Sequence, residues 1–158
     1  MCGITQGSQL AFCYCLRHRE GISAKHRLIT RGIDVDKATK EARLSVFDAV
    51  ELLNGLMEAG EPNRERFLLQ LANIIRTTEA AAVAEKTPFV VFGEMGAVLW
   101  EQKKYDAAIR LEQLWSELAQ TYSFYLCCGY PASAFQEDSK GDPYAAICAE
   151  HTDVVSTF

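Results

Sequence analysis

Four short segments of the chain are almost continuously apolar, and stretches with helical periodicity alternate with them. The apolar segments lie at residues 10–16, 43–49, 88–94 and 123–130. A strand is apolar along its whole length when both of its faces are buried, which is typical of parallel sheets covered by helices. The alternation therefore predicts an α/β fold with a mainly parallel sheet. It does not predict the order of the strands.

Helical patterns fill the intervals between and after these segments. Apolar side chains recur at helical spacing over residues 18–32, 48–60, 63–85, 105–122 and 141–155. Gly32 and Gly60 are the expected stops of the first two helices, because glycine readily adopts the conformation that ends a helix. Asp142 as cap and Pro143 in the first turn are the expected start of the last helix.

Composition and charge narrow the class of protein. The 158 residues are 49% hydrophobic and carry a net charge of −5, without an internal repeat or a linker, so we expect one globular domain over 1–158 that binds neither nucleic acid nor membrane. Most of the six cysteines lie in apolar runs, where a thiol behaves as a small hydrophobic group. Reduced thiols and a cytoplasmic location follow as expectations.

Several kinds of catalytic or cofactor site are missing from the sequence. The glycines form neither GxxxxGK[ST] nor GxGxxG, and there is no GxSxG, so nucleotide hydrolysis and serine catalysis are not expected. Cys13, Cys15 and His18 offer three metal ligands at most, whereas a structural zinc site needs four. We therefore expect a protein that is not an enzyme and that holds no metal or other cofactor.

Adjacent cysteines near a turn leave one enzymatic alternative open. Cys127 and Cys128 end an apolar run, and His151 is a conceivable base for a thiolate nucleophile. The competing interpretation is packing, since adjacent strand residues point to opposite faces of a sheet. We favour packing and keep a cysteine-dependent enzyme as the alternative.

An acid stands where a buried strand meets a short helix, in "FVVFGEMGAVLW". Glu94 follows the strand end, and open α/β sheets bind their ligands at the carboxyl ends of strands. The competing explanation is a helix cap, because a carboxylate at a helix N-terminus gains about 0.3–1 kcal/mol. Glu94 is therefore a candidate polar anchor or a capping residue.

Further acids and aromatic residues fall near the same expected sheet edge. Glu112 shares a helical face with Trp115, Trp100 closes the short helix that Glu94 opens, and Tyr130 follows another strand. Acids and large aromatic side chains around a strand-end crevice are typical of a small-molecule pocket. The sequence thus predicts a binding site for a small molecule rather than for a nucleotide.

These motifs together resemble the MEDS domain, the methanogen/methylotroph sensory domain named for a dichloromethane-responsive bacterial regulator. Such domains show a GEM after an apolar strand, then LW, LExLW, an LCxY strand end and a downstream histidine, which match residues 93–95, 99–100, 111–115, 126–130 and 151. "LCCGYP" has one residue more than the commonest form, so either cysteine is the counterpart. The resemblance covers 9–158, and the polar lead 1–8 stands where the family has its first β-α unit, which is expected to be missing.

The resemblance implies a RecA-like three-layer sandwich without a phosphate-binding loop. It also implies a non-catalytic sensory domain for a small, hydrocarbon-like organic ligand, coupled to a histidine kinase or transcriptional output partner, with a homodimer left open. A protein-interaction or dimerisation module without ligand is the alternative. The candidate ligand-binding residues are Glu94, Met95, Trp100, Glu112, Trp115, Cys127, Tyr130 and His151.

Overall fold

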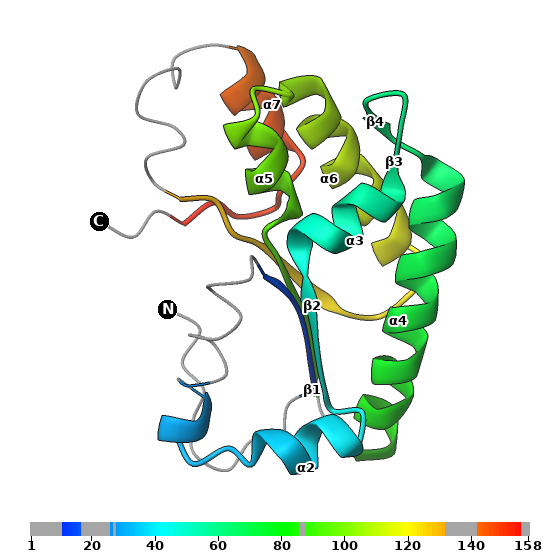
Figure 1. Cartoon of the computed structure of the whole chain (residues 1–158), viewed down its shortest axis with the longest axis vertical. Coiled ribbons are helices and arrows are strands. Elements are labelled where there is room, and N and C mark those ends of the chain that lie inside the picture. The colour runs from blue at the N-terminus through cyan, green and yellow to red at the C-terminus, as the bar shows by residue number, and fades with distance from the viewer. Residues whose placement is uncertain (1–10, 17–25, 27, 86–87, 132–141, 156–158) are drawn as a thin grey trace.

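The structure, a computed structural model, describes residues 11–16, 26, 28–85, 88–131 and 142–155. It is mixed α/β, with a central sheet flanked by helices (Figure 1). The sheet has the strand order β2-β1-β5-β6, and each neighbouring pair is parallel. Its strands are β1 (Ala11–Leu16), β2 (Leu44–Asp48), β5 (Phe89–Gly93) and β6 (Tyr125–Cys128). Each predicted apolar segment thus contains one strand, which confirms the α/β class.

The strands end together at one edge of the sheet. Leu16 pairs with Asp48 across β1 and β2, and Gly93 pairs with both Cys15 and Cys128. Because the strands are parallel, whatever follows each of them is delivered to the same edge. The sequence prediction that Glu94 and Tyr130 follow strands ending at a common edge is confirmed.

The helices follow the predicted patterns closely in the second half of the chain. They are α2 (Val35–Lys40), α3 (Ala49–Leu56), α4 (Arg64–Glu85), α5 (Met95–Glu101), α6 (Tyr105–Ala119) and α7 (Asp142–Ala149). Two of them begin at an aspartate whose side chain accepts backbone N–H groups of the first turn, Asp34 for α2 and Asp48 for α3.

Three sequence predictions about helices need correction. Helix α3 ends at Leu56 rather than Gly60, because a hairpin of β3 (Met57–Glu58) and β4 (Glu61–Pro62) follows at once. Gly60 serves the hairpin turn, with φ +93°. Helix α7 stops at Ala149, so residue 151 lies beyond it. The short helix α2 was not predicted, since six residues carry too little periodicity to be recognised.

Part of the sequence analysis falls outside the described residues. The polar lead 1–8, His18 and most of the helix predicted over 18–32 belong there. Gly32, the predicted stop of that helix, has φ +80°, the left-handed conformation that suits glycine at the end of a helix.

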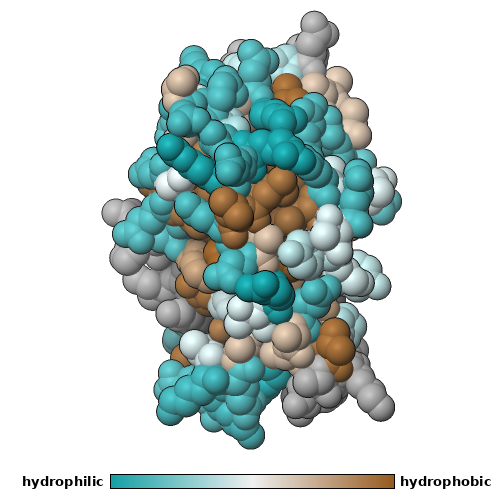
Figure 2. Space-filling view, turned by 90° about the vertical axis from the view of Figure 1, so that its right-hand side faces the viewer, coloured by the Kyte–Doolittle hydropathy of each residue, from teal (hydrophilic) through white to brown (hydrophobic). Residues whose placement is uncertain are grey.

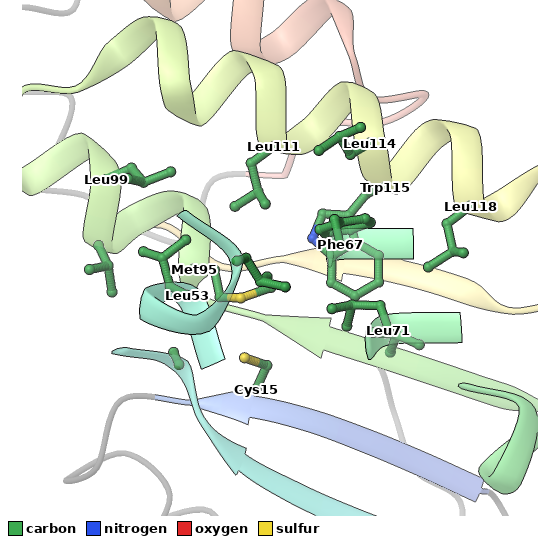
Figure 3. Close-up of a cluster of buried hydrophobic side chains, with 14 of the residues drawn as sticks. Cys15, Leu53, Phe67, Leu71, Met95, Leu99, Leu111, Leu114, Trp115 and Leu118 are labelled. Carbon is green, nitrogen blue, oxygen red and sulfur yellow. The ribbon is translucent and has the colours of Figure 1, made fainter. Parts of the chain in front are cut away.

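The main core lies between the sheet and α3–α6. Cys13, Cys15 and Val91 point from the strands into this core, while Leu44 of β2 packs with Leu28 and Ala38 in a second, smaller cluster. Alternate strand residues therefore bury opposite faces of the sheet, as the continuous apolar runs predicted. Figure 3 shows the main core, with leucines of α6 directed at side chains of α4 and α5.

The surface carries a patch of apolar side chains. Figure 2 shows them in the middle of the face that lies on the right in Figure 1, surrounded by hydrophilic residues. Leu69 and Val83 of α4 are among the most exposed apolar residues of the described chain, at 67% and 71%. Within the described residues, every helix is too short or too polar to cross a lipid bilayer.

Candidate functional site

A buried carboxylate, that of Glu112, lies at the centre of the candidate site. Helix α6 turns Glu112 toward the interior along with its apolar residues, and the residue is only 2% exposed. The Tyr130 hydroxyl donates to Oε1 at 2.6 Å, and the Cys128 thiol donates to Oε2 at 2.9 Å. Each carboxylate oxygen thus accepts a hydrogen bond from the end of β6 or the residues just after it, which offsets part of the cost of burial.

His151 completes this group, which we call the Glu112 cluster: Glu112, Cys128, Tyr130 and His151. Its Nε2 lies 3.7 Å from Oε2 of Glu112, and its Nδ1 lies 2.8 Å from the carbonyl oxygen of Ile147. Because a carbonyl only accepts, Nδ1 carries the proton of the neutral ring and Nε2 keeps its lone pair. The ring therefore directs either a lone pair or, when protonated, an N–H toward the carboxylate.

Close packing of α5 against the cluster depends on Gly96. A Cβ atom at this position would lie 2.2 Å from the Tyr130 hydroxyl and 2.7 Å from Oε1 of Glu112. Trp100, one turn further along α5, is nearly buried and meets the Tyr130 ring edge-on at a centroid distance of 6.1 Å. The missing side chain of Gly96 is what allows Tyr130 to reach Glu112.

The donors of the cluster stay protonated at neutral pH. Burial raises the pKa of the Tyr130 hydroxyl and the pKa of the Cys128 thiol, and the neighbouring Glu112 carboxylate raises both further. Burial also raises the pKa of Cys13 to about 12. Since the thiolate is the nucleophilic form, Cys128 lacks the activation that the alternative of a cysteine-dependent enzyme requires.

Glu94 occupies the N-cap position of α5, yet its side chain makes no capping hydrogen bond. Its backbone N–H donates to the carbonyl of Cys15 at 2.9 Å, which ties the strand end of β5 to β1. The side chain is half-buried at the strand-end edge of the sheet. A simple capping role therefore lacks the bond that would define it.

Two predicted ligand contacts lie in the main core. Trp115 is 2% exposed, with its ring edge-on to Phe67 at 5.1 Å and near Phe124 at 6.3 Å. Met95 is 1% exposed and points into the same core, as Figure 3 shows. Trp115 thus packs among aromatic residues of the core and, as the sequence pattern predicted, lies on the buried face of α6 with Glu112. A ligand-binding role for Trp115 or Met95 stays a prediction.

The two adjacent cysteines have different surroundings. Cys127, the cysteine named as a candidate ligand contact, is exposed, and Cys128, which the motif left open as the other counterpart, reaches Glu112. Cys128 pairs with Gly93 and therefore points to the same face as Cys15, while Cys127 points to the opposite face. The strand register was the signal that decides between them, and it was not readable from the sequence.

Replacing Glu112 with glutamine is expected to lower the free energy of unfolding by about 2 kcal/mol. The carboxylate accepts from Tyr130 and Cys128, whereas an amide offers one accepting oxygen and turns an NH₂ toward the other donor. Urea unfolding measures the loss. The control is Glu65→Gln in the exposed first turn of α4, which should change stability by less than about 1 kcal/mol, the most that an exposed acid gains at a helix N-terminus. Equal stability of the two variants would contradict the prediction.

Comparison with known protein families identifies the domain. The family model described as MEDS, the methanogen/methylotroph, DcmR sensory domain, matches residues 3–143, which is most of the chain. The chain belongs to the MEDS family. Comparison with curated proteins and with solved structures gave no significant match.

The tertiary structure brings the recognised MEDS motifs together. Residues 93–95 lead into α5, 111–115 lie on α6, and 126–130 contain the end of β6. Glu112 and Tyr130, from two of these motifs, meet in the Glu112 cluster together with His151, which lies beyond the matched residues. MEDS is a family of sensory domains, and a sensory role for this chain follows from its membership.

Proposed function

We propose that this MEDS domain, over residues 1–158, is a non-catalytic cytoplasmic sensor of a small, hydrocarbon-like organic ligand. It acts through an output partner such as a histidine kinase or a transcriptional module, on a RecA-like three-layer sandwich. The observation that carries the proposal is the Glu112 cluster: a buried carboxylate held by Tyr130 and Cys128 at the carboxyl edge of a parallel sheet. This edge is where open α/β sheets bind ligands.

The cluster offers both polar and apolar contacts to a small molecule. Trp100 and Tyr130 supply aromatic surface, and Glu112 supplies an acceptor whose present donors are a hydroxyl and a thiol. A ligand that carries a hydroxyl group and a short apolar chain matches this combination. Glu94 lies two residues before Gly96, which adjoins the cluster, and is a further polar contact at the same edge.

Ligand binding at this place has a direct mechanical consequence. The cluster joins α6, β6 and the segment after α7, since His151 is tied to Ile147 and faces Glu112. A ligand that replaces Tyr130 or Cys128 as a hydrogen-bond donor to Glu112 breaks a contact between α6 and these segments. The displaced segments then supply the signal that an output partner reads.

The test asks whether a small molecule binds and whether the edge acids matter. Native mass spectrometry of the purified chain looks for a co-purified ligand, and thermal shifts are measured with dichloromethane and C1–C4 alcohols. We expect Glu94→Gln to change the ligand response by about tenfold while the fold stays intact, which corresponds to about 1.4 kcal/mol of binding energy.

Glu65→Gln, an acid in the exposed first turn of α4, is the matched control and should respond like the wild type. A Glu94→Gln protein that unfolds would show that the acid is a structural residue. A folded variant with an unchanged response would remove Glu94 from the site. No response of the wild type to any probe, with nothing co-purified, would contradict the proposal.

The exposed apolar side chains of α4 favour a second candidate function, a homodimer without ligand. Leu69 and Val83 are 14 residues apart, roughly four helical turns, and so lie on one side of the helix. A second copy of the chain is the partner that such a self-complementary face would accept. Sedimentation velocity distinguishes a dimer from a monomeric sensor.

A further inference from the structure

Three side chains with different metal-binding atoms converge within the Glu112 cluster. A carboxylate oxygen of Glu112, the sulfur of Cys128 and a ring nitrogen of His151 all lie within 4.8 Å of one another. They come from α6, β6 and the segment after α7, at positions 112, 128 and 151, so no short spacing motif in the sequence identifies them as metal ligands. In the described part of the chain, this is the one such group of three.

We propose that Glu112, Cys128 and His151 bind a divalent metal ion of the zinc class. Thiolate, imidazole and carboxylate are together the ligand set of zinc and of its spectroscopic substitute cobalt, whereas calcium and magnesium prefer oxygen alone. The inference rests on the proposed function, because it takes this cluster as the sensing site. It deepens that function by naming a divalent metal ion as a ligand of the site.

Two of the three separations between the ligand atoms fit a tetrahedral ion with small adjustments, and the Cys128 sulfur and the His151 nitrogen lie within 4.8 Å of each other. Metal–ligand distances of roughly 2.0–2.3 Å place the ligand atoms of a tetrahedral site about 3.3–3.7 Å apart. In the cluster the Cys128 sulfur is 2.9 Å and the His151 Nε2 is 3.7 Å from the same oxygen of Glu112. Shifts of well under 1 Å for these two contacts, within side-chain rotation, bring them to the ion.

The neighbours of the three ligands orient them as neighbours in metal sites do. The carbonyl of Ile147 accepts a hydrogen bond from Nδ1 of His151, which leaves the lone pair of Nε2 available for a metal ion. The Tyr130 hydroxyl holds Oε1 of Glu112 and leaves Oε2 facing both Cys128 and His151. Both hydrogen bonds orient a metal-binding side chain, and neither of them occupies the atom that would bind the metal.

The negative charge of Glu112 favours binding of a cation by the cluster. Glu112 is 2% exposed, and the partners that donate hydrogen bonds to it are neutral groups. A dication binds the carboxylate directly and converts the Cys128 thiol to a metal thiolate with release of one proton to solvent, Cys–SH + M²⁺ → Cys–S–M⁺ + H⁺. The resulting site of one carboxylate, one thiolate and one dication is neutral.

Three protein ligands leave a position of the ion open. Structural zinc sites close all four positions with protein, whereas an ion with three protein ligands keeps one for water or for a small molecule. A donor atom of an organic ligand is suited to that position. The metal would thereby join the apolar wall of Trp100 to the polar end of the ligand that the proposed function requires.

The experiment is a titration of the EDTA-treated full chain with Co²⁺, followed by displacement with Zn²⁺. We expect one Co²⁺ per chain with a near-ultraviolet sulfur-to-cobalt band. Cys128→Ser keeps a hydroxyl to donate to Glu112 and should lose the band. Cys127→Ser, the adjacent exposed cysteine that points to the opposite face, is the matched control and should keep it.

A positioning role is tested with Tyr130→Phe, which leaves the three ligands in place. It should weaken Co²⁺ binding by about tenfold, as is usual when a partner of a metal ligand is removed. A wild-type chain without stoichiometric Co²⁺ binding, a band that persists in Cys128→Ser, or a band lost equally in Cys127→Ser overturns the proposal. Circular dichroism confirms that each variant is folded.

Repeating the thermal-shift measurements with organic probes on EDTA-treated protein distinguishes this inference from the proposed function. Binding of an organic probe to a chain that takes up no Co²⁺ leaves the sensory proposal standing and overturns the metal site. Stoichiometric Co²⁺ binding through Cys128 supports the metal site, even where no organic probe binds and the organic part of the proposed function fails.

Discussion

Replacing Trp115 with alanine is expected to lower the free energy of unfolding by about 3–5 kcal/mol. The indole is 2% exposed and packs edge-on against Phe67, which is itself fully buried, with Phe124 beside it. Figure 3 shows Trp115 and Phe67 together in the middle of the core, between leucines of α4 and α6. Truncation removes these contacts and leaves a cavity that rigid helices cannot fill.

Urea unfolding followed by far-ultraviolet circular dichroism measures this loss. Leu69→Ala on the exposed side of α4 is the control, and it should change stability by less than about 0.5 kcal/mol because Leu69 is 67% exposed. The result also distinguishes two roles of Trp115. A Trp115→Ala variant with wild-type stability and an altered ligand response would make Trp115 a ligand contact, as the sequence pattern suggested.

Replacing Gly96 with alanine is expected to destabilise the fold by about 3–5 kcal/mol, the sum of overpacking and a lost charge-assisted hydrogen bond. The added Cβ would stand 2.2 Å from the Tyr130 hydroxyl and 2.7 Å from Oε1 of Glu112, so the two groups must separate. Neither has room to retreat, since Tyr130 also packs against Trp100 and Glu112 is buried.

Gly55→Ala in α3 is the matched control, because it is the same substitution within another helix. Its added Cβ would meet only the Gln70 side chain at 3.4 Å, an ordinary contact. Alanine is the better helix former, so this variant should be more stable by about 0.5 kcal/mol. Equal effects of the two substitutions in urea unfolding would show that Gly96 is not required for the Tyr130–Glu112 contact.

The Gly96→Ala variant also tests the proposed role of the Glu112 cluster in sensing. A Gly96→Ala chain that still folds at low temperature has lost the Tyr130 donor to Glu112 but retains Cys128 and His151. Its response to organic probes therefore reports how much of the site depends on Tyr130 alone. Gly96→Ala removes only the hydrogen bond from Tyr130, whereas replacing Glu112 removes the acceptor of both hydrogen bonds at once.

Local patterns predicted most of the secondary structure for identifiable reasons. Helix α4 was found within one residue at its start because Phe67, Leu71 and Ile75 recur at helical spacing over a long segment. The end of α3 was misplaced because Met57 and Glu58 continue the apolar and polar pattern, while their pairing with β4 is set by the hairpin turn. A pattern of side chains does not record which backbone groups pair.

The candidate site was predicted in part. Glu112, Tyr130 and His151 were named from their motifs, and all three meet in one cluster. The motif left Cys127 and Cys128 open as counterparts and only Cys127 was named as a ligand contact, because the choice between adjacent strand residues depends on which face of the sheet meets α6. The resemblance to the family named Glu112 and His151 as candidates, but it did not predict that their side chains lie 3.7 Å apart.

By itself, the sequence determined the α/β class, the parallel sheet and the membership of the MEDS family, because these depend on periodicity and on motifs that lie within short segments. Only the tertiary structure decided that Glu112, Cys128 and His151, from positions 112, 128 and 151, lie together in one cluster around a buried carboxylate. The physical reason is that strand register and helix packing set which side chains meet. Both arise from contacts between segments far apart in the chain.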